Sequence, residues 1–322
     1  MSMGKIVLSL GGNALVPSGG PGSAGSQWDI AKRSLEPVAD LIAEGHLVVI
    51  THGNGPIVGN IWDRNRAAAA EIPPMPLDVC GADSQGGIGY MIQQVIGNVL
   101  AARRIGRSVV SLVTQVVVDS TDPAFAKPTK PIGRFLQRPV AERLQHEEGW
   151  RVMEDAGRGF RRVVPSPRPL EIVEWEAIRD LVDAGVVVVA VGGGGIPVVR
   201  RADGTLHGVE AVVDKDLASS LLARRLGAEG LVTVTAVPRV AIRFGKPDQK
   251  ELDRMTVTEA RGHLRAGEFP EGSMGPKILG AVEFLEAGGR WAVVTDPVSV
   301  REAIAGRRGT RLVPDAGARV GA

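Results

Sequence analysis

The stretch VVVVAVGGGGIP, residues 186–197, with DKD at residues 214–216, decides the fold. Its first six residues are apolar and suit one buried strand, which breaks into four consecutive glycines. The DKD sequence begins a segment with helical apolar spacing that runs to about Leu226. A buried strand, a loop of bare backbone and a charged helix start together form anion sites in α/β proteins. A tight turn beside a solvated charge cluster would give the same pattern.

The bulk composition excludes several classes of partner. The 322 residues carry 38 Lys and Arg against 36 Asp and Glu, so a net charge of +2 gives no general attraction to nucleic acid or to an anionic membrane. The apolar runs are of strand length, and Met1 leads directly into one of them, which predicts a soluble, cytoplasmic protein. The single cysteine, Cys80, excludes an internal disulfide and favours an inert buried thiol over a nucleophile.

Apolar strands alternate with amphipathic helices along most of the chain. Strands that are apolar on both faces indicate a mostly parallel sheet covered on both sides. We expect strands at residues 5–10, 47–51, 109–118, 186–191, 231–235 and 291–295. We expect helices around residues 35–42, where Pro37 leaves the start open, from 85 to 100, and at 171–184, 214–226, 257–265 and 277–287. Residues 119–165 are rich in proline and lack clean periodicity, which predicts an excursion from the sheet.

Three of the predicted strands end in glycine-rich turns, at residues 11–13, 53–55 and 192–195. Ligands of parallel sheets bind beyond the carboxyl ends of the strands. Any one of these turns could be an ordinary connection. Their common position indicates a shared binding edge.

Three lysines, Lys130, Lys215 and Lys277, have proline, aspartate or glycine close to them in the sequence, which is unusual for surface lysines. Bare backbone together with a few lysines suits a polyphosphate, whose transfer depends on positioning and charge stabilisation. Each lysine taken alone could be a surface charge. The phosphate-loop, dinucleotide-binding, zinc and serine-hydrolase motifs are absent from the sequence.

Six segments together resemble the carbamate kinases of the amino acid kinase superfamily, in unbroken order from about Lys5 to Thr310. They are GGNAL at 11–15, THGNGP at 51–56, DPAF with PTKPIG at 122–133, GGGGIP at 192–197, DKDLA at 214–218 and GSMGPK at 272–277. The PTKPIG and GSMGPK segments are the most specific to this family.

The resemblance implies an open three-layer αβα sandwich formed by a single domain, residues 1–322. The acceptor would bind in about 1–184, with a protruding subdomain at about 119–165, and the nucleotide in about 185–322. It further implies magnesium-dependent phosphoryl transfer between ATP and carbamate, giving ADP and carbamoyl phosphate, in a homodimer. Arginine breakdown is the metabolic setting that it suggests.

The resemblance also implies the roles of individual residues, and it places Mg²⁺ on the ATP phosphates, with no protein metal site. The catalytic residues would be Lys130, Lys215, Lys277 and Asp216. The acceptor and the transferred phosphoryl would meet N–H groups of Gly11, Gly12, Asn13, Gly53 and Asn54, and the backbone of Gly193 and Gly194 would approach them closely. The nucleotide would meet Asp214, Lys215, Thr235, Ala236, Phe244, Met274, Pro276 and Lys277.

The sequence departs from the family pattern at two positions. Ile57 stands where the family usually has glutamine, and Pro238 stands where an acidic residue is common. Two alternatives therefore stay open: a kinase of another small carboxylate or carbamate-like acid, and a catalytically silent nucleotide or metabolite sensor on the same fold.

Overall fold

The computed structural model describes residues 4–12, 24–154, 159–270 and 272–316. Its centre is an eight-stranded sheet in which every neighbouring pair is parallel except β16 with β17. The strand order is β15 (Arg254–Thr256), β17 (Thr310–Val313), β16 (Trp291–Thr295), β12 (Gly230–Val234), β1 (Lys5–Leu10), β2 (Leu47–His52), β9 (Val187–Val189) and β3 (Val109–Ser111).

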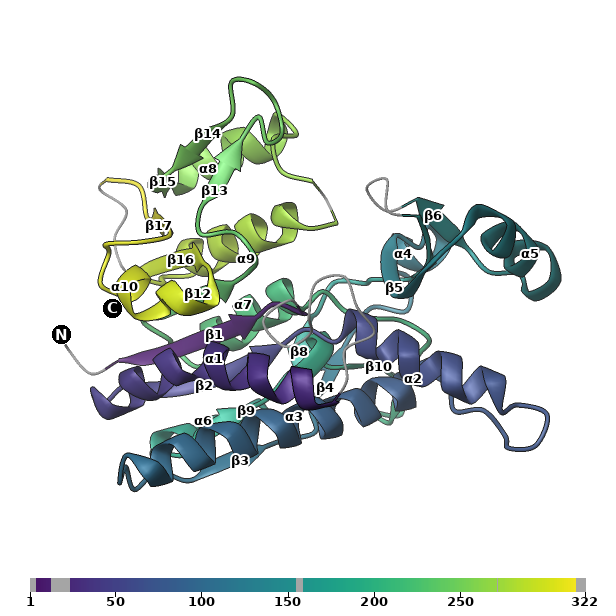
Figure 1. The fold of residues 1–322 in the computed structure, drawn as a ribbon, viewed down its shortest axis with the longest axis horizontal. Coiled ribbons are helices and arrows are strands. Elements are labelled where there is room, and N and C mark those ends of the chain that lie inside the picture. Colours follow the sequence, from purple (N-terminus) through teal and green to yellow (C-terminus); the bar gives the residue numbers. More distant parts are fainter. Residues whose placement is uncertain (1–3, 13–23, 155–158, 271, 317–322) are drawn as a thin grey trace.

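Helices cover both faces of this sheet, which confirms the predicted αβα sandwich (Figure 1). Side chains alternate along β1, so that Ile6, Leu8 and Leu10 face one helix layer while Val7 and Ser9 face the other. The first layer contains α1 (Ala24–Ala43), α3 (Leu77–Ala102) and α10 (Val300–Ile304). The second contains α6 (Trp175–Asp183), α7 (Lys215–Arg225), α8 (Val257–Arg265) and α9 (Met274–Glu286).

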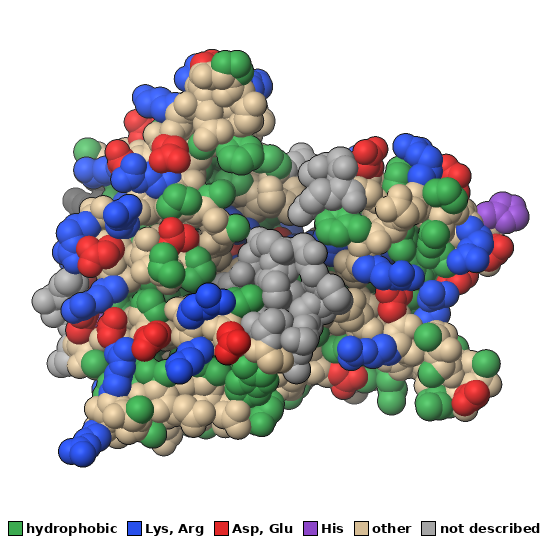
Figure 2. Space-filling model, viewed as in Figure 1, with side chains coloured by type: hydrophobic (Ala, Val, Ile, Leu, Met, Phe, Trp, Pro, Cys, Tyr) green, Lys and Arg blue, Asp and Glu red, His purple; other side chains and the backbone are tan. Residues whose placement is uncertain are grey.

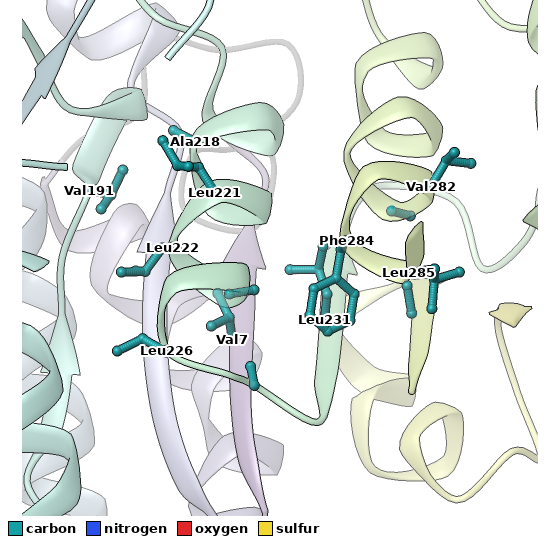
Figure 3. Close-up of a cluster of buried hydrophobic side chains, with 14 of the residues drawn as sticks. Val7, Val191, Ala218, Leu221, Leu222, Leu226, Leu231, Val282, Phe284 and Leu285 are labelled. Carbon is teal, nitrogen blue, oxygen red and sulfur yellow. The ribbon is translucent and has the colours of Figure 1, made fainter. Parts of the chain in front are cut away.

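Helix α7 is buried on almost every side because it lies between the sheet and α9. Figure 3 shows Leu221 and Leu222 of α7 in the same apolar cluster as Val7 of β1 and Phe284 of α9. The two helices approach closely at Gly280, where an added Cβ would lie 2.7 Å from the carbonyl oxygen of Asp216. This packing fixes the first turn of α7 relative to the sheet.

Three smaller sheets complete the fold. The strands β11 (Leu206–Gly208), β10 (Ile196–Arg200), β4 (Gln115–Val117) and β8 (Glu171–Ile172) form one, and β13 (Val240–Ile242) pairs with β14 (Lys250–Leu252) in another. The third forms the protruding subdomain visible in Figure 1. It contains β5 (Lys130–Leu136), β7 (Phe160–Val164) and β6 (Val152–Glu154), with the helices α4 (Pro123–Ala126) and α5 (Arg138–Glu148) nearby in sequence.

The subdomain is anchored on α2 (Gly55–Ala67) by a close backbone approach. A Cβ added at Gly59 would lie 2.0 Å from the Cα of Gly133, so only glycine allows this contact. Beside it, Trp62 of α2 packs edge-on against Trp150 with ring centroids 5.2 Å apart. The Arg162 guanidinium lies 3.9 Å from the Trp62 ring centroid, which adds a cation–π contact.

Several predicted boundaries are wrong. The strand expected over 109–118 divides into β3 and β4, which belong to different sheets. The chain leaves the central sheet at Thr114 because both the N–H and the carbonyl oxygen of Thr114 bond to the side-chain amide of Gln85. The helix expected over 171–184 begins only at Trp175, after β8, and Pro37 lies well inside α1.

The structure also bears on the predictions about membrane spans and about Cys80. None of the helices that the structure describes is long and apolar enough to cross a membrane. Cys80 is buried, and burial, followed by the nearby Asp83 carboxylate, raises the pKa of its thiol to about 11, as expected for an inert thiol.

Candidate functional site

The carboxyl ends of β1, β2 and β9 bring the three predicted glycine turns together, since these strands are neighbours in the sheet. A Cβ added at Gly53 would lie 3.4 Å from the N atom of Gly12 and 3.2 Å from Cδ of Lys215. A Cβ at Gly193 would lie 2.1 Å from the Asn54 amide nitrogen. The three turns therefore lie together at one edge of the sheet, as predicted, and binding of a ligand there stays a prediction. In Figure 2 the surface is hollowed between the lobe carrying β13–β15 and the protruding subdomain.

A buried carboxylate, Asp216, holds two lysines at this edge. Its Oδ1 lies 2.7 Å from Nζ of Lys215, and its Oδ2 lies 3.2 Å from Nζ of Lys277. Ser9 completes the cluster, because its hydroxyl accepts a hydrogen bond from Lys215 (2.6 Å) and donates one to Asp216 (3.1 Å). Lys277 also donates to the carbonyl oxygen of Ser273, 3.1 Å away. The lysines are thus fixed by partners from β1, α7 and the N-cap of α9.

The third predicted lysine reaches the same helix from the protruding subdomain. Nζ of Lys130, the first residue of β5, lies 2.5 Å from Oδ2 of Asp214. The other oxygen of Asp214 accepts a hydrogen bond of 2.9 Å from the backbone N–H of Asp216 and thereby caps α7. One carboxylate therefore connects the subdomain to the start of α7.

The charges in the cluster support one another. Burial raises the pKa of the Asp216 carboxyl, but the ammonium groups of Lys215 and Lys277 outweigh burial and hold that pKa below its ordinary value. Burial lowers the pKa of Lys215, against the attraction of Asp216. Burial also acts to lower the pKa of Lys277, but the carboxylates of Asp216 and Asp214 raise it overall. An ionised Asp216 makes two ammonium groups tolerable so close together.

The glycine turn after β9 is held by residues that the sequence analysis missed. Gln85 of α3 donates to the carbonyl oxygens of Gly192 (2.9 Å) and Thr114 (3.1 Å) and accepts from the Thr114 N–H. The Thr114 hydroxyl accepts from the N–H of Val191, which has a left-handed φ of 53°. Gln85 therefore positions the turn. Its only signal in the sequence was a polar residue at the start of the predicted apolar pattern, whereas the helix itself begins earlier, at Leu77.

Two other missed residues had comparable signals. Ser9 is a polar residue inside the apolar strand KIVLSL, and this could have marked it as functional. Ser84 precedes Gln85 and accepts a hydrogen bond of 2.8 Å from the Asn54 amide, which orients that side chain toward Gly193.

One part of the predicted glycine roles is wrong. The N–H groups of Gly11 and Gly53, both predicted to meet the ligand, donate instead to the carbonyl oxygens of Val234 and Leu10. The N–H of Gly194, where only a close backbone approach was predicted, donates to Val191. These N–H groups are committed to the backbone, so Gly11, Gly53 and Gly194 contribute space to the site. The predicted residue Asn13 lies outside the described residues.

The predicted nucleotide residues are distributed around the cluster. Thr235 follows β12, and its Cα would lie 3.7 Å from a Cβ added at Gly11. Met274 and Pro276 lie in the first turn of α9, beside Lys277, and Asp214 caps α7. Ala236 is exposed, as is Phe244, which follows β13 with 65% of its surface accessible. A nucleotide role for these residues stays a prediction.

Metal-ligating side chains do not cluster in the part of the chain that the structure describes, since no three His, Cys, Asp or Glu residues there could hold one ion. The two carboxylates at the site, Asp214 and Asp216, are each paired with a lysine. A divalent cation would therefore depend largely on oxygens from a ligand.

Comparisons with known proteins agree with this geometry. The model of the amino acid kinase family matches residues 4–296. The carbamate kinase of Pyrococcus furiosus is 47% identical, covering 97% of this chain and 100% of the relative. The carbamate kinase-like protein YqeA of Escherichia coli is 48% identical, covering 95% and 98%. The structure of carbamate kinase from Giardia lamblia bound to AMP-PNP is 42% identical, with a TM-score of 0.89 over 98% of this chain and 99% of that one. The chain therefore belongs to the amino acid kinase family, in its branch of carbamate kinases and carbamate kinase-like proteins.

Proposed function

We propose that the protein is a carbamate kinase, which transfers a phosphoryl group reversibly between ATP and carbamate to give ADP and carbamoyl phosphate. The observation that carries this proposal is the convergence of Lys130, Lys215 and Lys277 on the two carboxylates that begin α7. The full-length similarity to carbamate kinases supports the choice of reaction.

The lysines suit phosphoryl transfer because charge spreads over the equatorial oxygens of the transferred group. Lys215 and Lys277 are fixed by Asp216 and Ser9 before any substrate binds, so little reorganisation is needed. Lys130 would turn from Asp214 to the phosphoryl oxygens, since the two are alternative anionic partners for one ammonium group. Asp216 would stay ionised and orient both of its lysines.

The site needs no general base, because a carbamate oxygen is already anionic near neutral pH. His52 is the histidine closest in sequence to the glycine turn Gly53–Gly55 that ends β2. Burial, and to a lesser extent the charge of Lys215, lowers the pKa of His52 to about 4 although a hydrogen bond to the Gly53 carbonyl opposes this shift. The neutral imidazole packs beside Gly192, where an added Cβ would lie 2.4 Å from its Nε2. We infer that His52 shapes the site by packing and does not act as a base.

We propose that Mg²⁺ accompanies the nucleotide. Magnesium in such sites is held by one or two carboxylates together with substrate phosphates and water. Asp214 and Asp216 could each offer an oxygen only in exchange for a lysine, so the phosphates would supply most of its ligands. When bound, the ion neutralises charge on the phosphate oxygens. Lys215 and Lys277 would bind the phosphates from the protein side.

We further propose that residues 1–184 bind the acceptor and residues 185–322 the nucleotide, with the protruding subdomain, residues 119–165, covering the acceptor. Lys130 supports this division, because it reaches from the subdomain to the start of α7. A homodimer is also proposed from the family resemblance. The exposed apolar side chains of Tyr90 in α3 and Val113 after β3 offer a surface for it.

A coupled assay with carbamoyl phosphate, ADP and Mg²⁺, in which ATP formation is followed, tests the function. We expect the wild-type protein to form ATP and Lys215→Ala to form it at about 1% of the wild-type rate or less. No ATP above background from the folded wild-type protein would refute the proposal.

The similarity to a carbamate kinase-like protein favours one alternative, a kinase of another small carboxylate. Ile57, beside the acceptor turn, is the residue where specificity would differ. A screen of small carboxylic acids with ATP separates the two functions. Nucleotide binding without turnover of any acceptor would instead support a sensor.

A further inference from the structure

A second cavity lies at the opposite end of the central sheet from the lysine cluster. It has a volume of about 520 Å³, and it is lined by residues at or just before the starts of β2, β12 and β16, together with the end of α10 and Arg311 of β17. The cluster lies beyond the carboxyl ends of these strands, so the two sites are separated by about 20 Å, the length of a six-residue strand. The lining residues are His46, Glu229, Arg290, Trp291, Ile304, Ala305, Gly306 and Arg311.

Arg311 of β17 is the unusual charge in this cavity. It is half-buried, and among the described residues it forms no ion pair. Its guanidinium lies 4.9 Å from the ring centroid of Trp291 and donates one hydrogen bond of 3.2 Å to the carbonyl oxygen of Ile304. A guanidinium carries five N–H donors, so most of its capacity remains for a ligand.

The charges near Arg311 favour binding of an anion in this cavity. Arg254 of β15 stands directly opposite Arg311 in the parallel pairing with β17, and like charges opposite one another destabilise a sheet. Burial, and next the charge of Arg254, lowers the pKa of Arg311, whereas Glu229 opposes this shift. Glu229 is itself paired with Arg290 at 3.0 Å. The cavity therefore retains an excess of positive charge.

The remaining walls define the rest of the ligand. Trp291, Ile304 and Ala305 form the apolar part of the lining, where Trp291 and Ile304 are largely buried, with 8% and 6% of their surfaces exposed. His46 accepts a hydrogen bond of 3.4 Å from the N–H of Gly4 at Nδ1, so Nε2 is the ring nitrogen that remains to donate to a ligand. The cavity thus combines cationic and N–H donors with an apolar wall.

We propose that this cavity is a second binding site, for a small molecule that carries a carboxylate or phosphate on a flat or apolar body. The oxyanion pairs with Arg311, and the body packs against Trp291. This site is separate from the proposed kinase reaction, so it stands or falls independently of that function.

Calorimetry with benzoate, phenyl phosphate and inorganic phosphate tests the proposal, at constant ionic strength and with ADP present in saturating amount. Benzoate against phenyl phosphate distinguishes a carboxylate from a phosphate, and inorganic phosphate tests whether the body contributes. We expect Arg311→Met to weaken binding of the preferred aromatic probe by about tenfold or more, because a charge-assisted pair is lost. Arg290→Met is the matched control, and we expect it to weaken binding less than about threefold because Arg290 is already neutralised.

Three results would overturn the proposal. The first is equal affinity of the probe for the wild type and Arg311→Met. The second is loss of binding in Lys277→Ala, which would place the probe in the lysine cluster. The third is that no probe binds at concentrations up to on the order of 10 mM. Circular dichroism establishes that each variant is folded. If Arg311→Met does not fold, Arg311→Lys replaces it: this variant keeps the charge but loses the planar stacking, and it must weaken benzoate or phenyl phosphate more than inorganic phosphate.

Discussion

Nζ of Lys130 lies 2.5 Å from Oδ2 of Asp214, across 84 residues of sequence. Lys130 begins the first strand of the protruding subdomain, and Asp214 caps the helix that carries Lys215 and Asp216. This ion pair therefore joins the subdomain to the lysine cluster. Because Lys130 is also a candidate ligand of the transferred phosphoryl group, the position of the subdomain and the charge of the site are linked.

Asp214→Asn should loosen the subdomain while leaving α7 capped, since asparagine also caps helices well. The ion pair is partly exposed, with 26% and 13% of the two side chains accessible, so its loss is worth about 1 kcal/mol at most. We expect amide hydrogen exchange in residues 130–136 to accelerate up to about fivefold, with residues 291–295 of β16 unchanged. Unchanged exchange in β5 would mean that the ion pair does not hold the subdomain.

Lys130→Ala and Lys215→Ala should each lower the rate of ATP formation from carbamoyl phosphate and ADP on the order of 10²-fold, as removal of a fixed electrostatic donor does elsewhere. Lys127→Ala is the matched control. It removes an exposed lysine three positions before Lys130, and we expect the wild-type rate. Wild-type rates in the Lys130 or Lys215 variant would show that the site has been misplaced.

Asp216→Asn should lower the free energy of unfolding more than substitution of any surface carboxylate does. Removing Asp216 leaves Lys215 and Lys277 without their shared counter-charge in a buried site, and breaking a buried ion pair costs about 3–5 kcal/mol. Asp40→Asn breaks the exposed pair with Arg103 and should cost less than about 1 kcal/mol. Urea unfolding of both variants measures the difference. Equal losses would show that the cluster contributes no more to stability than a surface pair.

The sequence predicted the parts of the site whose signals are local. Helix α8 and the strand β16 have the predicted ends, and α7 begins one residue after the predicted Asp214 because that aspartate is its cap. Lys215 and Asp216 were found because a charged pair at a helix start is visible in a few residues. The apolar runs also gave the parallel sheet, since its strands are buried on both faces.

The parts that could not be predicted depend on partners distant in the sequence. Ser9 bonds to Asp216 across 207 residues, and Gln85 bonds to Gly192 across 107. The division of residues 109–118 into two strands likewise depends on the hydrogen bonds of Gln85 to Thr114, although the polar residues Thr114 and Gln115 interrupt the apolar run where the division falls. The backbone hydrogen bonds of the Gly11 and Gly53 N–H groups could not be predicted for the same reason, because their acceptors lie on other segments.

His52 should make the protein less stable in mild acid. In the unfolded chain its imidazole binds a proton below about pH 6.5, whereas burial lowers its pKa in the folded protein to about 4. Protons therefore favour the unfolded state, so the stability is fully present above pH 6.5 and is lost as the pH falls toward 4. The loss is about 3 kcal/mol. Thermal unfolding of the wild type and His52→Gln between pH 7 and pH 4 checks this, and parallel profiles would contradict it.

Gly194→Ala should damage the site through the backbone alone. Gly194 has a φ of +94°, and an added Cβ would lie 2.3 Å from the carbonyl oxygen of Val213, one residue before the cap of α7. Gly204 is the matched control, because it has a similar φ of +86° but open space around the new Cβ. Gly204→Ala should therefore cost about 1–2 kcal/mol from the left-handed conformation alone. We expect Gly194→Ala to cost more than this in urea unfolding and to lower turnover, since the clash displaces the backbone that leads into Asp214 and Lys215. If both variants lost the same stability and kept full activity, the close approach at Gly194 would have no part in positioning the lysines.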